Sequence, residues 1–484
     1  MHRMKRFFAI LTVLCLVMGM FAACGGNSQT ADPTGTQASS PTGEQEGTQP
    51  SAGGETEGTQ PVEGTTPSES VPDESKPEES KPEESKPEES KPEESKPEQT
   101  RPADPNKLTL TLYHNLNTKS AALLNSRLAG FTEKNPDIQV VLKDCGGKLK
   151  GDETGGVLLC NTGLVAQYGQ SGAILRLDTM ADPLTQEQLN DYQNFHNVGS
   201  GQMYSLPVMR SGLVVYYNNS FFDVNGISVP YTWEQMETVC KKIKELDPDA
   251  TPLLCDAGAD LFLSMCSQMG VSAGDFDNAK IQSFMKTLND WSQKGYLLST
   301  TKSSAVNQTW QSGKAYMVIA DSTAAAKYRP EKSGDAFVFE LGVAHLPKFN
   351  SGSAGVAVQG WDACVLKTED ENLQKAAWLL VKYLSADTEF QREFPKGAGY
   401  CPVLISAETA DSYLAYLRQG NGSEQVTALA ARVFLEQQYA YVDHKASASA
   451  RTAMGSLMDK CLGFTGSADS QIAAAVKEAA NACK

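Results

Sequence analysis

Side chains that could perform catalysis are few in this 484-residue sequence, and none of them forms a known catalytic motif. The five histidines stand at positions 2, 114, 196, 345 and 444, without the His-Glu-x-x-His spacing of zinc proteases. The sequence contains no Gly-x-Ser-x-Gly elbow that would expose a serine nucleophile, and no phosphate-binding loop. We therefore predict that the protein is not an enzyme, and we predict no catalytic residue, metal ligand or cofactor.

Cysteines are the other group of reactive side chains, and nine of the eleven follow residue 106. These nine form no Cys-x-x-Cys pair, and most stand in apolar runs, where cysteine behaves as a small core residue. For an exported protein, this usage indicates a reducing habitat. A disulfide between Cys461 and Cys483 stays open as an alternative.

The first 24 residues are predicted to be an export signal. Three basic residues precede an apolar run over 7–23, which is followed at once by glycine, serine and threonine residues. Phe-Ala-Ala-Cys at 21–24 resembles the bacterial lipobox, so Cys24 is predicted to be lipidated and to become the mature N-terminus. The alternative is an uncleaved single-span anchor. Both interpretations place the remaining chain outside the cytoplasmic membrane.

Residues 25–106 are predicted to form a disordered acidic linker. They contain no leucine, isoleucine, methionine or aromatic residue, so they cannot bury enough apolar surface to offset the entropy of ordering. Glu-Ser-Lys-Pro-Glu repeats five times over 74–98, which predicts a stiff, extended spacer. This linker carries 19 acidic and 6 basic residues, and therefore most of the net charge of −16. The acidic total argues against a nucleic-acid partner.

The body that follows alternates between strand and helix patterns. Leu108, Leu110 and Leu112 alternate with threonines, which predicts a strand, and an amphipathic helix is predicted over 120–131. Strands at 138–142 and 157–160 complete the start of a parallel, doubly wound sheet. Further strands are predicted at 213–217, 251–255, 316–320, 337–343 and 363–366, and further helices at 233–246, 278–294, 372–384, 423–441, 448–462 and 468–482.

Two details of these helices concern their ends and their buried faces. Thr232 is predicted to cap the helix at 233–246, with Gln235 at the capping-box position. Trp233, Trp291 and Trp378 fall on amphipathic helical stripes and are predicted to be core residues. A body of this length is too large for one core, so two lobes are predicted.

Seven short motifs of the body resemble, in order, the pattern of extracellular solute-binding proteins of family 1, the receptor subunits of ABC importers. The motifs are Tyr-Ser-Leu-Pro at 204–207, Tyr-Asn at 217–218, Gly-Ile at 226–227, Pro-Tyr-Thr-Trp-Glu-Gln-Met at 230–236, Trp-Gln-Ser-Gly-Lys-Ala-Tyr-Met at 310–317, Leu-Gly-Val-Ala-His-Leu-Pro at 341–347 and the helix around 376–384. The resemblance extends from Leu108 to the C-terminus. From Gly342 through Tyr400 to Arg451 it is strongest to glycerol-3-phosphate and glycerophosphodiester receptors, with sugar receptors nearly as similar.

The resemblance implies an α/β, two-lobed periplasmic-binding-protein-like (type II) fold with a hinge and a ligand cleft between the lobes. Lobe 1 is predicted to comprise 107–211 plus 321–359, and lobe 2 to comprise 212–320 plus 360–484. The chain is predicted to cross between them near 211–213, 320–321 and 359–360. One segment departs from the family, because 146–156 supplies only about eleven residues where a full helix usually connects the second and third strands.

Eight residues are predicted to contact the ligand: Tyr113, His114, Asn161, Arg210, Ser211, Trp361, Tyr400 and Arg451. The first three end predicted strands. Arg210 and Ser211 stand at the first crossing, where the arginine donor fork would suit an anionic or polyol ligand. Trp361 stands at another crossing, where its ring could stack on a sugar, and Tyr400 and Arg451 match positions of the glycerophosphate receptors.

Each of these assignments has a structural alternative. Tyr113 and His114 could belong to a loop whose polar groups are satisfied internally. Trp361 could be a buried hinge residue. Arg451 stands in an alanine-rich helix, where a lone arginine is commonly solvated.

The predicted function is that of the substrate-binding receptor of an ABC importer, which captures a small solute, foremost a carbohydrate, and delivers it to a membrane permease. A glycerol-3-phosphate or glycerophosphodiester receptor is one alternative. The long linker leaves a surface sensor or adhesion module as another. The predicted partners are the solute, the permease subunits and the membrane through the lipid anchor, with no nucleic acid. The protein is predicted to be a monomer at the outer face of the bacterial cytoplasmic membrane.

Overall fold

The computed structural model describes the chain from residue 104 to residue 482 with short gaps, as residues 104–147, 149–151, 153–192, 202–272, 275–276, 278–299, 303–349, 355–440, 448–463 and 469–482. The predicted signal with Cys24, the linker up to residue 103 and Cys483 lie outside these residues. None of the helices in the described part of the chain combines the length and the apolar character that a bilayer crossing requires.

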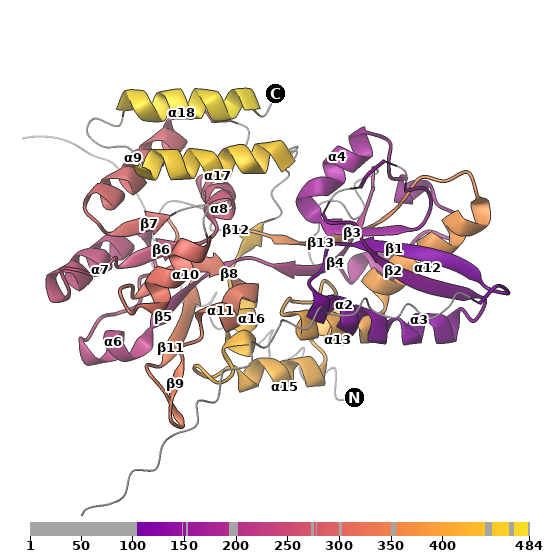
Figure 1. The fold of residues 1–484 in the computed structure, drawn as a ribbon, viewed down its shortest axis with the longest axis horizontal. Helices are drawn as coiled ribbons and strands as arrows, with labels where there is room; N and C mark the ends of the chain where they lie inside the picture. The colour runs from indigo at the N-terminus through magenta and orange to yellow at the C-terminus, as the bar shows by residue number, and fades with distance from the viewer. Residues whose placement is uncertain are drawn as a thin grey trace, which may run out of the picture. The chain divides into compact units, whose positions relative to one another are not determined.

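The first of two larger sheets has five strands in the order β2-β1-β3-β13-β4 (Figure 1). The strands are β1 (Leu108–His114), β2 (Ile138–Asp144), β3 (Val157–Asn161), β4 (Leu206–Ser211) and β13 (Gln359–Val365). β1 pairs in parallel with β2 and β3, whereas β13 runs antiparallel to β3 and β4. The predicted alternation in β1 is confirmed, since Leu110 and Leu112 are fully buried.

Helices from two distant parts of the chain cover the first sheet. They are α2 (Thr118–Arg127), α3 (Ala129–Lys134), α4 (Val165–Gln170), α5 (Gln186–Asn190), α12 (Glu371–Ala386), α13 (Thr388–Ala398) and α14 (Ile405–Glu408). α12 packs on β13 and β4, and α13 packs on α2. Leu124, Phe131 and Trp378 bring these helices into one buried cluster with the sheet. The core therefore joins segments that lie more than 200 residues apart.

The second sheet has the strand order β11-β5-β8-β6-β7. Its strands are β5 (Leu213–Asn218), β6 (Leu253–Cys255), β7 (Leu297–Ser299), β8 (Met317–Asp321) and β11 (Leu341–His345). β6 runs parallel to β7 and β8, whereas β5 runs antiparallel to both β8 and β11. Two small ribbons complete the strands: β9 (Lys332–Ser333) with β10 (Ala336–Phe337), and β12 (Val356–Ala357) with β14 (Tyr439–Ala440).

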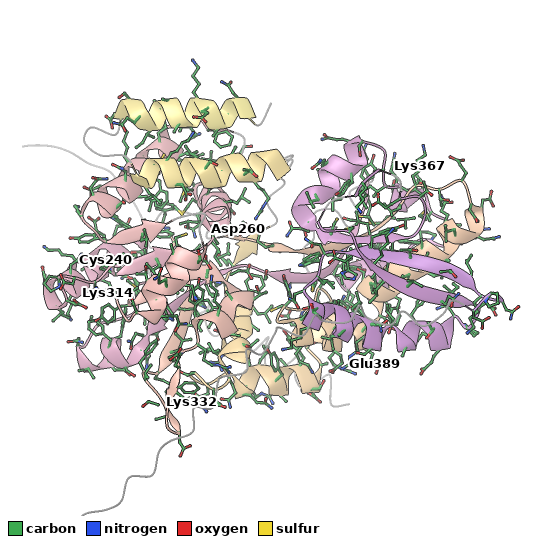
Figure 2. The ribbon with its side chains drawn as sticks, viewed as in Figure 1. Cys240, Asp260, Lys314, Lys332, Lys367 and Glu389 are labelled. Atoms are coloured by element: carbon green, nitrogen blue, oxygen red, sulfur yellow. The ribbon has the colours of Figure 1, made fainter. Side chains whose placement is uncertain are left out.

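The helices packed around the second sheet are α6 (Asn219–Val224), α7 (Trp233–Leu246), α8 (Gly258–Met269), α9 (Ala279–Gln293), α10 (Ser303–Gln311), α11 (Ala325–Tyr328), α15 (Asp411–Gln419), α16 (Val426–Glu436), α17 (Ala448–Gly463) and α18 (Asp469–Ala482). The predicted capping box of α7 is confirmed: Thr232 accepts a hydrogen bond from Gln235 N–H, and the Gln235 side chain accepts one from Thr232 N–H. Cys240 of the same helix, labelled in Figure 2, is fully buried.

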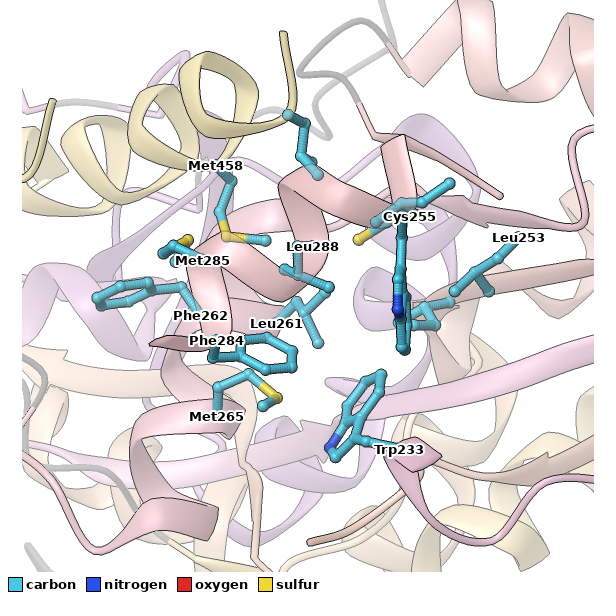
Figure 3. Close-up of a cluster of buried hydrophobic side chains, with 14 of the residues drawn as sticks. Trp233, Leu253, Cys255, Leu261, Phe262, Met265, Phe284, Met285, Leu288 and Met458 are labelled. Atoms are coloured by element: carbon cyan, nitrogen blue, oxygen red, sulfur yellow. The ribbon is translucent and has the colours of Figure 1, made fainter. Parts of the chain in front are cut away.

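Aromatic and sulfur-containing side chains fill the core of the second sheet (Figure 3). Trp233 of α7 contacts Phe284 of α9 edge to face, with ring centroids 5.5 Å apart. Met458 of α17 reaches the same cluster from the C-terminal part of the chain. The prediction that Trp233, Trp291 and Trp378 are core residues is confirmed, because each is at most 3% exposed.

The chain passes from the first sheet to the second at Gly212, returns between β12 and β13, and passes again to the second between α14 and α15. The crossings predicted near 211–213 and 359–360 agree with these pairings. The crossing predicted near 320–321 is wrong, because β11 follows that point and pairs with β5 of the second sheet. The division of the lobes is corrected accordingly: β11 belongs with the second sheet, and β13 and α12 with the first.

Gly360 of β13 packs too closely against β4 to accept a side chain, since a Cβ atom there would lie 2.1 Å from the backbone oxygen of Met209. Backbone cannot move aside as a flexible side chain can, so we expect Gly360→Ala to lower the free energy of unfolding by about 2 kcal/mol. Urea unfolding measures this loss. Gly463→Ala is the control, because no atom lies within 4 Å of a Cβ placed there. Equal effects of the two substitutions would contradict the packing argument.

Candidate functional site

Polar side chains gather where the chain first passes between the two sheets. Ser211 is the last residue of β4 and Asp321 is the last residue of β8. Ser211 Oγ donates a hydrogen bond of 2.9 Å to Asp321 Oδ2. The bond joins the first sheet to the second, directly beside the connecting residue Gly212.

Asp321 is held by its own loop as well. Its Oδ1 atom accepts hydrogen bonds from the Thr323 N–H at 2.9 Å and from the Thr323 hydroxyl at 2.7 Å. Burial nevertheless raises the pKa of Asp321 to about 6, and the negative charge of Asp260 adds to this rise against the lowering effect of the hydrogen bonds. Near neutral pH the Asp321 carboxylate is therefore charged, although burial and the charge of Asp260 disfavour its ionised form.

Asp260, Arg451 and Gln359 form the second part of this polar cluster. Asp260, labelled in Figure 2, stands in the first turn of α8 and accepts a hydrogen bond from Arg451 Nη2 of α17. Arg451 Nη1 donates to Gln359 Oε1 of β13 at 2.9 Å. Gln359 pairs with Ser211 in the register of β13 and β4, so the two parts of the cluster are adjacent.

Gln359 retains an unused donor. The residue is 7% exposed, and its Nε2 atom is buried without a hydrogen-bond partner. A buried amide without a partner costs free energy, so a ligand oxygen or a water molecule at this point would be stabilising. Gln359 is thus the strongest candidate donor in the described part of the cluster.

Trp361 and Tyr400 form an aromatic pair next to the same cluster. Trp361 Nε1 donates a hydrogen bond to the Tyr400 hydroxyl at 3.0 Å. The pairing of β13 with β4 shifts register between Trp361 and Asp362. Such a bulge re-aims side chains in a sheet. Burial, and then the charge of Asp321, raise the pKa of Tyr400 to about 12, so its hydroxyl stays protonated. Tyr400 therefore lies within electrostatic range of Asp321.

Arg210 lies in the adjacent strand but is engaged elsewhere. It is fully buried, and its Nε atom donates to the backbone oxygen of Pro402 at 2.8 Å. Its Nη2 atom pairs with the Glu408 carboxylate. This guanidinium therefore holds together the segment after α13.

The residues predicted at the ends of β1 and β3 make local contacts. His114 Nδ1 accepts a hydrogen bond from Leu116 N–H at 3.2 Å, and the side chain is 5% exposed. Tyr113 packs in a small buried cluster with Cys160 and Cys364. Asn161 caps the short helix that follows β3 by accepting from Gly163 N–H, and it faces Trp361 in the register of β3 and β13.

The structure thus brings together four of the eight predicted residues through hydrogen bonds and shared neighbours, namely Ser211, Trp361, Tyr400 and Arg451. Asp260, Asp321 and Gln359 belong to the same cluster and were not among the predicted residues. Asp321 and Gln359 lie at positions that the sequence suggested as crossings, and this could have identified them. Asp260 gave no such signal, because it stands in α8, which the sequence pattern did not predict.

Two observations limit the chemistry that the described residues can perform. Among them, no three histidine, cysteine, aspartate or glutamate side chains are grouped as a metal site would require. A cavity of about 540 Å³ lies beside β11 and α16 and is lined by none of the eight predicted residues. The polar cluster and this cavity are separate features.

Comparison with known proteins identifies the sequence pattern and the fold. The profile described as bacterial extracellular solute-binding protein matches residues 127–418. The cyclic alpha-maltosyl-1,6-maltose binding protein from Arthrobacter globiformis is similar at 17% identity and a TM-score of 0.62, with 78% of this chain and 99% of that chain covered. The sugar-binding protein MalE from Xanthomonas citri is similar at 16% identity and a TM-score of 0.62, with 78% and 97% covered.

UgpB from Mycobacterium tuberculosis, solved in complex with glycerophosphocholine, is also similar, at 17% identity and a TM-score of 0.59, with 78% of this chain and 98% of that chain covered. At these identities the likeness establishes the fold. The predicted two-lobed, periplasmic-binding-protein-like α/β fold is thereby confirmed.

Proposed function

The chain belongs to the bacterial extracellular solute-binding protein family, and from this premise we propose that it captures a neutral carbohydrate or polyol for delivery to the membrane permease of an ABC importer. The family consists of binding proteins, so the chain is a binding protein and not an enzyme. The observation that carries the choice of ligand is the polar cluster of Ser211, Asp260, Asp321, Gln359 and Arg451 at the junction of the two sheets.

The charges of this cluster favour a neutral ligand over an anionic one. Arg451 is paired with Asp260, and the second predicted anion-binding residue, Arg210, is paired with Glu408. Asp321 adds a further carboxylate. A phosphate group would meet more negative than positive charge here, and like charges brought together in an interface cost several kcal/mol.

The hydrogen-bonding groups of the cluster suit hydroxyl groups. Carboxylates accept bonds from hydroxyls, and Gln359 Nε2 offers a donor without a partner. The ring of Trp361, hydrogen-bonded to Tyr400, supplies an apolar surface next to these groups. Small-molecule sites commonly combine such aromatic surface with a few placed polar groups. Ser211, Trp361, Tyr400 and Arg451 thus remain the proposed ligand contacts, with Asp260, Asp321 and Gln359 added. Asn161, which faces Trp361, is proposed at the margin.

A thermal-shift screen tests this function. We expect a neutral oligosaccharide or polyol to raise the melting temperature, because a ligand that binds the folded state alone stabilises it by about 2.7 kcal/mol at a hundredfold excess over Kd. Trp361→Ala should reduce the rise, whereas Trp361→Phe should retain most of it. The screen includes glycerol-3-phosphate and glycerophosphocholine. A shift with these compounds and none with neutral sugars would instead support the glycerophosphodiester receptor, and no shift with any compound would refute the proposal.

The position of the protein in the cell is part of the same proposal. We infer that Cys24 is lipidated, that the linker 25–106 spaces the receptor from the membrane, and that the receptor acts as a monomer at the outer face of the cytoplasmic membrane. The lipobox-like sequence at 21–24 and the absence of long apolar residues from the linker support this inference. A Cys24→Ala variant recovered in the culture medium instead of the membrane fraction would support it further.

A further inference from the structure

The cavity of about 540 Å³ beside the second sheet has the features of a binding site of its own. Its volume falls in the range of small-molecule sites. It opens where β11 forms the edge of the sheet, and Val343, Ala344 and His345 of that strand line it. It shares no residue with the polar cluster at the junction of the sheets.

One wall of the cavity is a regular stripe of α16. Leu429, Arg432, Val433 and Glu436 line it, at the spacing that places side chains on one face of a helix. The wall therefore presents an apolar pair and a charged pair together. An entirely apolar ligand would cover the charged pair without offering it hydrogen bonds, which is costly.

Another part of the lining is the segment before α7, which presents Tyr231 on a hydrogen-bonded backbone. The N–H of Tyr231 donates to Gln235 Oε1 at 2.8 Å, and its carbonyl oxygen accepts from the Lys348 N–H at 3.1 Å. The residue is 51% exposed, although Trp233 two positions later is in the core, and Lys348 Nζ lies over its ring, 4.5 Å from the ring centroid. An exposed aromatic ring on a restrained backbone loses little entropy on binding, which makes it a good contact surface.

Polar groups in the cavity have hydrogen-bonding capacity to spare. Glu436 Oε2 lies 3.9 Å from His345 Nε2, and Glu436 Oε1 lies 4.0 Å from Arg432 Nε. Both distances exceed that of a hydrogen bond, so these groups attract one another without satisfying one another. They offer both donors and acceptors to a ligand, and the carboxylate offsets the guanidinium charge.

We propose that this cavity is a second carbohydrate-binding site, in which a neutral sugar ring lies against Tyr231 and its hydroxyl groups bond to Arg432, His345 and Glu436. A pyranose has an apolar C–H face and a hydroxyl edge, and the lining of the cavity offers both an aromatic ring and polar side chains. The site would hold the receptor on a polysaccharide while the junction between the sheets takes up a soluble ligand. The inference uses none of the residues of the proposed function.

The test measures binding of an equimolar mixture of malto-, cello-, xylo- and mannotetraose to the whole mature protein by isothermal titration calorimetry. The protein carries Trp361→Ala, which removes the contact proposed for the first site. We expect residual saturable binding that Tyr231→Ala weakens by about tenfold, or about 1.4 kcal/mol, while Tyr231→Phe retains it. Val338→Ala is the matched surface control, because Val338 is 60% exposed and does not line the cavity.

The outcomes separate this inference from the proposed function. Residual binding that Tyr231→Ala leaves unchanged, or no residual binding at millimolar concentrations, would overturn the second site and leave the first untouched. Preference for tetragalacturonate over the neutral mixture would overturn its neutral specificity. If Tyr231→Ala weakens binding to the otherwise wild-type protein and Trp361→Ala leaves that binding unchanged, the proposed function is refuted and the second site alone is supported. Tyr231→Ala is expected to fold, because half of the side chain already faces solvent.

Discussion

Arg210→Ala is expected to lower the free energy of unfolding by about 3–5 kcal/mol, because breaking a buried ion pair from one side leaves the other charge uncompensated. Arg210 is fully buried and bonds to both the Pro402 carbonyl oxygen and the Glu408 carboxylate. Burial already raises the pKa of Glu408, and the Arg210 charge opposes that rise. Without the arginine, Glu408 loses the charge that balances its burial. Chemical denaturation of the purified variant measures the loss.

A double variant separates the pair from simple packing. Arg210→Met combined with Glu408→Leu removes both charges and retains apolar volume, so it should recover much of the stability lost in Arg210→Ala. The sequence analysis assigned Arg210 to the ligand instead. If Arg210→Ala loses less than about 1 kcal/mol and yet abolishes the ligand-induced thermal shift, that assignment is correct and the structural role is wrong.

Asp321→Asn is expected to change how stability depends on pH. The folded pKa of Asp321 is raised to about 6 from an ordinary value of 3.8. Protonation therefore favours the folded state, and this contribution is fully present below pH 3.8 and is lost as pH rises through about 6. Asparagine does not titrate. The variant should thus gain on the wild type by at most about 3 kcal/mol between pH 4 and pH 7, less any screening by solvent.

The measurement is the difference in free energy of unfolding between the two proteins at several pH values, in which the titration of all other groups cancels. Asp335→Asn is the control for the loss of one negative charge, because Asp335 is exposed in the turn between β9 and β10. A difference that does not vary with pH would mean that the pKa of Asp321 is not raised in the folded state. A gain at low pH instead of high pH would reverse the sign argued here.

Local patterns predicted individual elements well where each element carries its own signal. The helix α7 has its cap, its apolar face and its stop within sixteen residues, and the structure places it over Trp233–Leu246 as predicted. The prediction for 120–131 was less accurate, since α2 ends at Arg127 and α3 begins at Ala129. The strand β4 was missed, because Pro207 and Arg210 interrupt its apolar pattern. Its pairing with β13 compensates for this interruption, and that pairing is a long-range contact.

The assignment of strands to lobes shows the same limit. The sequence predicted β11 in lobe 1 and β13 in lobe 2, and strand pairing places them the other way round. Both segments are short and apolar, and nothing within them distinguishes one sheet from the other. The segment β11 pairs with the edge of β5, and β13 pairs between β3 and β4, so the available strand partners decide the sheet of each.

For the candidate site, residue types were easier to predict than partners. Ser211 and Trp361 were predicted from their positions at chain crossings, and both lie beside the polar cluster. Asp260 stands in a helix that the pattern did not indicate. His114 was predicted to contact a ligand, and in the structure its Nδ1 atom accepts a hydrogen bond from the N–H of Leu116. The end of a strand predicts where a polar side chain lies, but the hydrogen-bonding groups nearest to that side chain decide what it bonds to.

The sequence by itself determined the family, the predicted export signal, the acidic linker and most of the helices, because each of these depends on composition or on spacing within a few turns. Only the tertiary structure decided which charged groups are available to a ligand. Arg210 meets Glu408 across 198 residues and Arg451 meets Asp260 across 191 residues. Pairs of such separation leave no local pattern, since they form only when two sheets and their helices close around the same point. Arg210 and Arg451, both predicted as ligand contacts, are therefore paired with carboxylates in the folded protein.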